Sequence, residues 1–134
     1  MTDSLDVNEW IRYAQMDYDA AKNMALLFNP VPLEIVCYHC QQGAEKILKA
    51  YAIAKNEPLV KTHNLKVIIE QCLKHDETFN LLAKNCLSLN GYSVISRYPI
   101  GEDAVTEQDM NIALKHASEV MGFTKEKLNR LGYK

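Results

Sequence analysis

Polar and charged side chains recur in one stretch of the chain that has the spacing of an amphipathic helix. Residues 40–50 read CQQGAEKILKA and place two glutamines, a glutamate and two lysines beside apolar side chains. Shortly afterwards, residues 61–65 (KTHNL) bring a histidine to the start of the next apolar segment. Ammonium and imidazole groups that meet where two helices are joined by a loop can bind an anion or a partner surface. These residue types do not by themselves specify a reaction.

Five side chains are the candidate ligand contacts: Lys46, Lys49, His63, Arg97 and Tyr98. The two lysines can bind phosphate, although spaced lysines on a helix commonly form a solvated face. The histidine is a candidate ligand contact, proton donor or hydrogen-bonding residue between loop and helix. A guanidinium followed by an aromatic ring can pair with a carboxylate or phosphate while the ring anchors it. We expect these side chains to surround one cleft.

Two carboxylates, Asp17 and Glu45, are the candidates for orienting these cations. Asp17 falls beside the apolar stripe of the first predicted helix, where desolvating a lone charge costs several kcal/mol. It therefore needs a partner, for which Lys46, Lys49 and Arg97 are the candidates. Two interpretations stay open: a stabilising ion pair at the edge of the bundle, or part of a ligand site.

The four cysteines occur on predicted apolar faces rather than in a metal-binding or redox arrangement. Cys37 and Cys40 share one side of a helix, and Cys72 and Cys86 lie in apolar stripes. Buried reduced cysteine behaves as a small hydrophobe, so we expect these residues in the core. The chain also lacks a glycine-rich phosphate loop, a Gly-x-Ser-x-Gly elbow and a His-Glu-x-x-His helix. We expect no metal and no cofactor.

The apolar side chains recur at steps of three and four residues, which predicts helices and no strand-like alternation. We expect one all-α domain over residues 1–134, an up-and-down bundle in which short connections make successive helices antiparallel. The pattern predicts about five helices, over residues 7–28, 33–55, 65–73, 79–95 and 110–131.

Several residues mark where these helices begin and end. Asn64 is a candidate cap for the third helix, and Thr106 with Asp109 resembles a capping box before the last one. Asn90-Gly91 predicts a bend in the fourth helix. The apolar stripes also assign core-facing positions to Phe28, Ala83, Leu87 and Leu131.

Composition is that of an ordinary globular protein. Of the 134 residues, 48% are hydrophobic and 24% charged, and the net charge is −2 with a pI near 6.1. The absence of a basic surplus disfavours tight non-specific nucleic-acid binding. The acidic amino terminus does not resemble a signal peptide, and no apolar run approaches the ~20 residues of a membrane helix. We therefore expect a cytoplasmic protein.

Four segments together resemble the HEPN domain in order and spacing: residues 14–21 (AQMDYDAA), 41–50 (QQGAEKILKA), 62–65 (THNL) and 96–99 (SRYP). The resemblance extends over roughly residues 10–131. It implies a helical bundle that often forms a homodimer and associates with nucleotides or RNA. It also implies a partner encoded alongside, a minimal nucleotidyltransferase in a toxin–antitoxin-like pair.

Many members of this superfamily are metal-independent ribonucleases that use an arginine, four to six intervening residues and a histidine. This chain departs from that pattern. The residues five to seven places after Arg12 are DYD, those after Arg97 are EDA, and LGYK follows Arg130. We therefore expect no catalysis through this motif.

The leading hypothesis is a non-catalytic HEPN-type module that binds a nucleotide, RNA or a partner nucleotidyltransferase. Lys46, Lys49 and Arg97 would capture an anion beside His63. One alternative is a divergent ribonuclease in which folding or dimerisation brings a histidine, such as His116, to Arg97. Another is a purely structural bundle that dimerises or docks a larger subunit.

Overall fold

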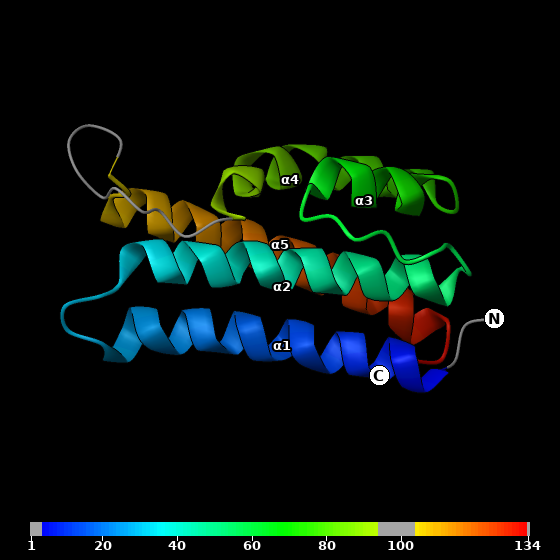
Figure 1. Ribbon diagram of the computed structural model, residues 1–134, viewed down its shortest axis with the longest axis horizontal. Coiled ribbons are helices and arrows are strands. Elements are labelled where there is room, and N and C mark those ends of the chain that lie inside the picture. The colour runs from blue at the N-terminus through cyan, green and yellow to red at the C-terminus, as the bar shows by residue number, and fades with distance from the viewer. Residues whose placement is uncertain (1–3, 94–103, 134) are drawn as a thin grey trace.

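Helices make up the structure, a computed structural model that describes residues 4–93 and 104–133 (Figure 1). Within these ranges, five α-helices and two 3-10 helices follow one another: α1 (Ser4–Leu27), α2 (Leu33–Ala54), α3 (Leu65–Leu73), η1 (Glu77–Leu82), α4 (Ala83–Leu89), η2 (Asn90–Tyr92) and α5 (Glu107–Arg130). No residue in the same ranges belongs to a β-strand. The prediction of an all-α bundle of about five helices is confirmed.

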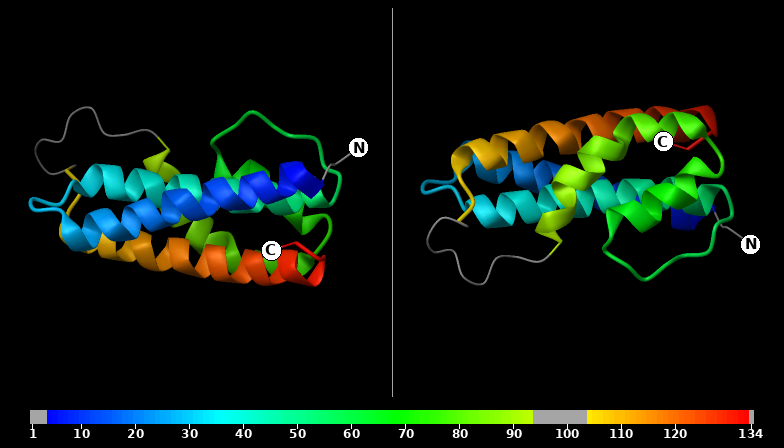
Figure 2. Two further views of the ribbon diagram at one scale, coloured as in Figure 1. Left: turned by 90° about the horizontal axis from the view of Figure 1, so that it is seen from below. Right: turned by 90° about the horizontal axis from the view of Figure 1, so that it is seen from above.

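α2 lies at the centre of the bundle. α1 and α5 pack along it, while α3 and α4 cover its remaining side (Figures 1 and 2). A short turn joins α1 to α2, and these two helices are antiparallel as expected. Segment 55–64 instead runs back along α2, so α3 points in the same direction as α2 (Figure 1). The antiparallel arrangement expected for short connections does not apply to this pair, because this connection is long enough to return beside the helix that precedes it.

Polar side chains fix the starts of α3 and α5 at the positions that the sequence predicts. The side-chain oxygen of Asn64 accepts a hydrogen bond from the backbone N–H of Lys66 at 3.0 Å. Before α5, the hydroxyl of Thr106 accepts from the backbone N–H of Asp109, whose carboxylate accepts in return from the backbone N–H of Thr106. These bonds satisfy backbone donors that have no partner inside the helix.

The fourth predicted helix begins as a 3-10 turn rather than an α-helix. The carboxylate of Asp76 caps this turn by accepting from the backbone N–H of Thr78 at 2.9 Å. The expected irregularity at Asn90-Gly91 is the 3-10 turn η2. The predicted continuation through Val94 and Ile95 lies outside the described residues.

The hydrophobic core is built around α2, and its largest fully buried side chains come from every α-helix and from η1: Val7, Val36, Ile47, Leu48, Leu65, Ile68, Phe79, Leu89, Val120 and Leu128. Four positions predicted to face the core do not, and one of them is Ala83, which is exposed at the start of α4. Phe28 is 54% exposed in the turn after α1, and Leu131 is 40% exposed just beyond α5. Leu87 is 79% exposed, because it lies one residue, about 100° of helix, away from buried Cys86.

α1 and α2 approach closely at one glycine. A Cβ atom added at Gly43 would lie 3.3 Å from the backbone oxygen of Ala14 and 3.5 Å from Cβ of Tyr18. The missing side chain therefore lets the two helices pack backbone against backbone. This contact brings Asp17, which precedes Tyr18, next to His39 and Lys46 of α2.

All four cysteines are free and buried, so the prediction that they pack in the core is confirmed. Burial raises the pKa of the Cys40 thiol to about 12 and that of Cys37 to about 11. Both thiols are therefore protonated at neutral pH. Among the described residues no cluster of histidine, cysteine and acidic side chains has the arrangement of a metal site. None of the described helices is long and apolar enough to cross a membrane.

A candidate ligand groove between α1, α2 and segment 55–64

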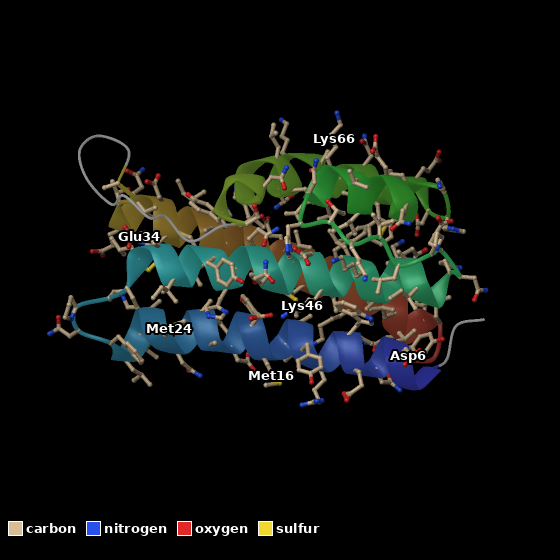
Figure 3. All side chains as sticks on the ribbon, in the orientation of Figure 1. Asp6, Met16, Met24, Glu34, Lys46 and Lys66 are labelled. Atoms are coloured by element: carbon tan, nitrogen blue, oxygen red, sulfur yellow. The ribbon has the colours of Figure 1, made fainter. Side chains whose placement is uncertain are left out.

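Asp17 of α1 and Lys46 of α2 form an ion pair across the helix interface. Nζ of Lys46 lies 2.6 Å from Oδ2 of Asp17, while Nδ1 of His39 lies 2.8 Å from Oδ1. Because the Asp17 side chain is only 12% exposed, these two contacts offset the cost of removing its charge from water. Figure 3 shows Lys46 between the two helices. Of the expected partners, Lys49 pairs elsewhere and Arg97 lies outside the described residues.

Glu45 is the centre of a second and more deeply buried network. One carboxylate oxygen lies 2.9 Å from Nζ of Lys49, one turn later on α2. The other lies 2.8 Å from Nδ1 of His63, which belongs to segment 55–64. The side chains of Glu45 and Lys49 are 3% and 9% exposed, whereas that of His63 is 67% exposed. A buried charge pair of α2 therefore holds an imidazole at the surface.

Two glutamines connect this network to the course of the chain. Nε2 of Gln41 donates to the backbone oxygen of His63 at 2.9 Å, and Nε2 of Gln42 donates to the side-chain oxygen of Gln41 at 2.7 Å. Both amides also lie 3.5 Å from Oε1 of Glu45. The glutamine pair thus fastens the loop to α2, which gives these residues a structural role beside any contact with a ligand.

A hollow opens on the surface beside Lys46. Its volume is about 790 Å³, within the range of small-molecule sites. Two aromatic residues of α1, Trp10 and Tyr13, line it opposite Leu59 of segment 55–64. The Lys46 ammonium lies 5.9 Å from the ring centre of Tyr13, within cation–π range. We call this space the aromatic hollow.

A smaller hollow of about 260 Å³ adjoins it and shares Trp10 and Leu59 with it. Lys49, Lys61 and His63 also line this second space, which we call the basic hollow. The Lys49 ammonium lies 5.6 Å from the ring centre of Trp10. Because the two hollows share residues, they form one continuous groove between α1, α2 and segment 55–64.

Three carboxylates stand at the rim of the aromatic hollow: Asp6, Glu9 and Glu57. The Arg12 side chain hydrogen-bonds to Glu9 and lowers the pKa of that carboxyl group. The hydrogen bond from His75 to Glu57, at 2.7 Å, does the same for the pKa of Glu57. Both glutamates are therefore ionised at neutral pH.

Residues 7–128 match the HEPN domain family. The chain belongs to that family. Solved structures share the fold: TT1696 from Thermus thermophilus aligns with a TM-score of 0.73, and ST0689, an archaeal HEPN homologue, aligns with a TM-score of 0.68. Each is 22% identical and covers 90% of this chain, and the alignments cover 97% and 96% of those two chains. No curated protein sequence matches.

Two of the segments on which the HEPN resemblance rests, residues 41–50 and 62–65, contribute side chains to this groove. Lys46, Lys49 and His63, all predicted ligand contacts, line it, with Glu45 and Asp17 paired beneath their cationic groups. The other two predicted contacts, Arg97 and Tyr98, lie outside the described residues. Ligand binding by these side chains stays a prediction.

Sequence reasoning missed Trp10 and Tyr13 as wall residues of the groove in this HEPN domain. Trp10 lies beside the apolar stripe of α1 and packs partly against the core, so its spacing marks it as a core residue. Tyr13, which is 46% exposed, carried no periodic signal. The outward position of an aromatic ring on a largely polar helix face was the one available hint.

A polar cluster around His116 lies away from the groove of this HEPN fold. Nδ2 of Asn85 lies 3.0 Å from Nδ1 of His116 and 2.9 Å from a carboxylate oxygen of Glu119. These contacts join α4 to α5 and hold His116 in place. The alternative of a ribonuclease built from His116 and Arg97 stays a prediction, because Arg97 lies outside the described residues.

Proposed function

We propose that this HEPN domain is a non-catalytic binding module that holds a nucleotide, free or within RNA, in the groove. The observation that carries the proposal is that two aromatic rings and three cationic or imidazole side chains line two adjoining hollows. Trp10, Tyr13 and Lys46 line the aromatic hollow, and Trp10, Lys49 and His63 line the basic hollow. Aromatic side chains stack on nucleobases, and cationic groups bind phosphate.

The cations keep donor capacity although each has an acidic partner. Lysine carries three N–H donors, and Lys46 makes one hydrogen bond to Asp17 while its side chain stays 26% exposed. His63 donates Nδ1–H to Glu45, so its Nε2 is a second donor, available to a phosphate, in the protonated imidazolium form. Lys61 is exposed at the edge of the basic hollow. An incoming phosphate therefore meets donors that the protein already holds in place.

Calorimetry with nucleoside triphosphates tests the proposal. We expect weak but measurable binding to the wild-type protein and a clear loss for Lys61→Ala and His63→Ala, which remove donors from the basic hollow. Lys66→Ala is the matched control, since this exposed lysine at the start of α3 lines neither hollow (Figure 3). Arg97→Ala tests the sequence-based contact. Wild-type protein that shows no binding at millimolar nucleotide would contradict the proposal.

A partner-binding role is the second candidate, favoured by an exposed apolar tip where α1 meets α2. Leu26, Leu27 and Phe28 are 80%, 72% and 54% exposed. Neighbouring apolar side chains exposed in this way commonly mark protein contacts. The HEPN resemblance implies two candidate partners for this apolar tip: a second copy of the chain, and a minimal nucleotidyltransferase of a toxin–antitoxin-like pair.

Light scattering on the purified protein tests the homodimer. We expect a dimer that Leu27→Ser weakens, whereas Leu81→Ser, at an equally exposed position on η1, leaves it unchanged. A monomer at all concentrations would exclude self-association. Co-purification with a nucleotidyltransferase encoded nearby tests the other occupant. Incubation with tRNA and mRNA tests ribonuclease activity, and cleavage that Arg97→Ala abolishes would replace the non-catalytic proposal.

A further inference from the structure

The groove carries opposite charges at its two ends. The basic hollow is lined by Lys49, Lys61 and His63, and the acid that partners two of them, Glu45, is buried beneath with 3% of its side chain exposed. Cationic groups therefore face a ligand at this end. No acidic side chain is among the residues that line this hollow in the described part of the chain.

The aromatic hollow has the opposite character. Asp6, Glu9 and Glu57 line it, and Lys46 is the one cation among its described wall residues. The Lys46 ammonium pairs with Asp17, at 2.6 Å, across the interface of α1 and α2. Each carboxylate has about four acceptor sites. The two bonds from Arg12 to Glu9, and the bonds from Lys74 and His75 to Glu57, therefore leave acceptor capacity at the rim.

An apolar stretch separates the two ends. Trp10 and Leu59 belong to both hollows, so a flat ring that stacks on Trp10 has cations on one side and carboxylates on the other. A ligand that fits this order has an anionic group, then an aromatic plane, then hydrogen-bond donors at its far edge. A nucleotide whose base carries an exocyclic amino group has these three parts in sequence.

We propose that the groove orients a nucleotide with its phosphate in the basic hollow and its base against Trp10, and that the rim carboxylates favour adenine and cytosine over their 6-oxo and 4-oxo counterparts. This inference rests on the proposed nucleotide binding. An amino group donates to a carboxylate, whereas the carbonyl oxygen of uracil or hypoxanthine meets like charge. Because a carboxylate accepts from the amino group but not from the carbonyl oxygen, the site discriminates amino bases from oxo bases.

Matched nucleotide pairs test the preference. Adenosine monophosphate and inosine monophosphate differ at position 6, and cytidine and uridine monophosphates differ at position 4, in each case by an amino group against a carbonyl. We expect the amino member to bind about threefold to tenfold more tightly in NMR titrations of the wild-type protein, the range that the net free energy of one typical hydrogen bond gives.

Two sets of substitutions separate the parts of the argument. The double substitution Asp6→Asn and Glu9→Gln removes negative charge at the rim and is expected to bring both affinity ratios close to one. Lys61→Ala is expected to weaken all four nucleotides by a similar factor and to leave the ratios unchanged. No binding of any nucleotide would overturn the proposed function itself. Equal binding within the pairs, or ratios that survive the double substitution, would overturn the base preference alone.

Discussion

The carboxylate of Glu45 lies 2.8 Å from Nδ1 of His63, which joins a buried acid of α2 to an exposed imidazole of the following segment. The same carboxylate binds Lys49 at 2.9 Å. The Glu45 side chain therefore positions the Lys49 ammonium and the His63 imidazole in the groove. It also anchors segment 55–64, which forms the outer wall of the groove.

Removing this carboxylate should destabilise the fold strongly. Glu45→Ala leaves the Lys49 ammonium, 9% exposed, without its partner, and breaking a buried ion pair in this way costs about 3–5 kcal/mol. Urea denaturation followed by circular dichroism measures the change in the free energy of unfolding. Glu126→Ala, which removes an exposed partner of Arg130, is the control and should show no measurable change. A loss below about 1 kcal/mol for Glu45→Ala would mean that Lys49 reaches solvent on its own.

The ion pair between Asp76 and Lys127, at 2.8 Å, should make stability depend on pH in the acidic range. The hydrogen bond from Lys127, with further bonds from Thr78, lowers the pKa of Asp76 from its ordinary value of 3.8 to about 2. Because the pKa is lower in the folded state, this contribution is fully present above pH 4 and disappears as the pH falls through about 2.

Asp76→Asn removes the charge while it keeps an acceptor for the η1 cap. We expect this variant to be less stable than the wild type at pH 7 by about 1 kcal/mol, the order of a partly exposed pair. The difference should shrink between pH 4 and pH 2, as thermal denaturation across this range can show. A difference that stays constant with pH would assign the effect to hydrogen bonding rather than charge.

The close approach of α1 and α2 at Gly43 should not tolerate a side chain. Gly43→Leu adds a side chain whose first carbon would already lie 3.3 Å from the Ala14 carbonyl oxygen, and overpacking of this kind costs about 1–3 kcal/mol. Gly122→Leu in α5 is the matched control, because no atom lies within 4 Å of the corresponding position. That substitution should be neutral or stabilising, since leucine favours helix over glycine. Equal effects in chemical denaturation would contradict the close packing.

The four cysteines should be unreactive in the folded protein. Burial raises the pKa of the Cys86 thiol to about 12 and also raises the pKa of Cys72. Since the thiolate is the reactive form, we expect almost no reaction with Ellman's reagent under native conditions and reaction of four thiols in denaturant. A thiol that reacts quickly in the folded state would show that its helix opens locally.

Local sequence signals were sufficient for most of the helices. Asn64, Thr106 and Asp109 act within three residues of the backbone groups that they cap, so their roles are visible without a structure. Apolar spacing likewise placed the buried faces of the long helices. It failed at Leu87 because α4 is short and only two of its buried residues, Cys86 and Leu89, are apolar, which is too few to define the direction of a face.

The groove depends on contacts that span much of the chain. Trp10 faces His63 across the basic hollow because segment 55–64 turns back along α2, and no periodicity encodes that return. The charges of Asp17, Glu45, Lys46 and Lys49 were visible in the sequence. Their division into two separate pairs was not, since it depends on how α1 and α2 are rotated about their axes.

Segment 55–64 is held by side-chain amides from two helices rather than by a backbone ladder. Gln41 binds the His63 carbonyl oxygen at 2.9 Å, and Gln71 binds that of Pro58 at 3.0 Å. Both anchors hold the chain at fixed points, so residues inserted between them would bulge outward and widen the opening without shifting α3. Evolution or design can therefore change the width of the groove opening by changing the length of the chain between Pro58 and His63, while α2 and α3 keep their positions.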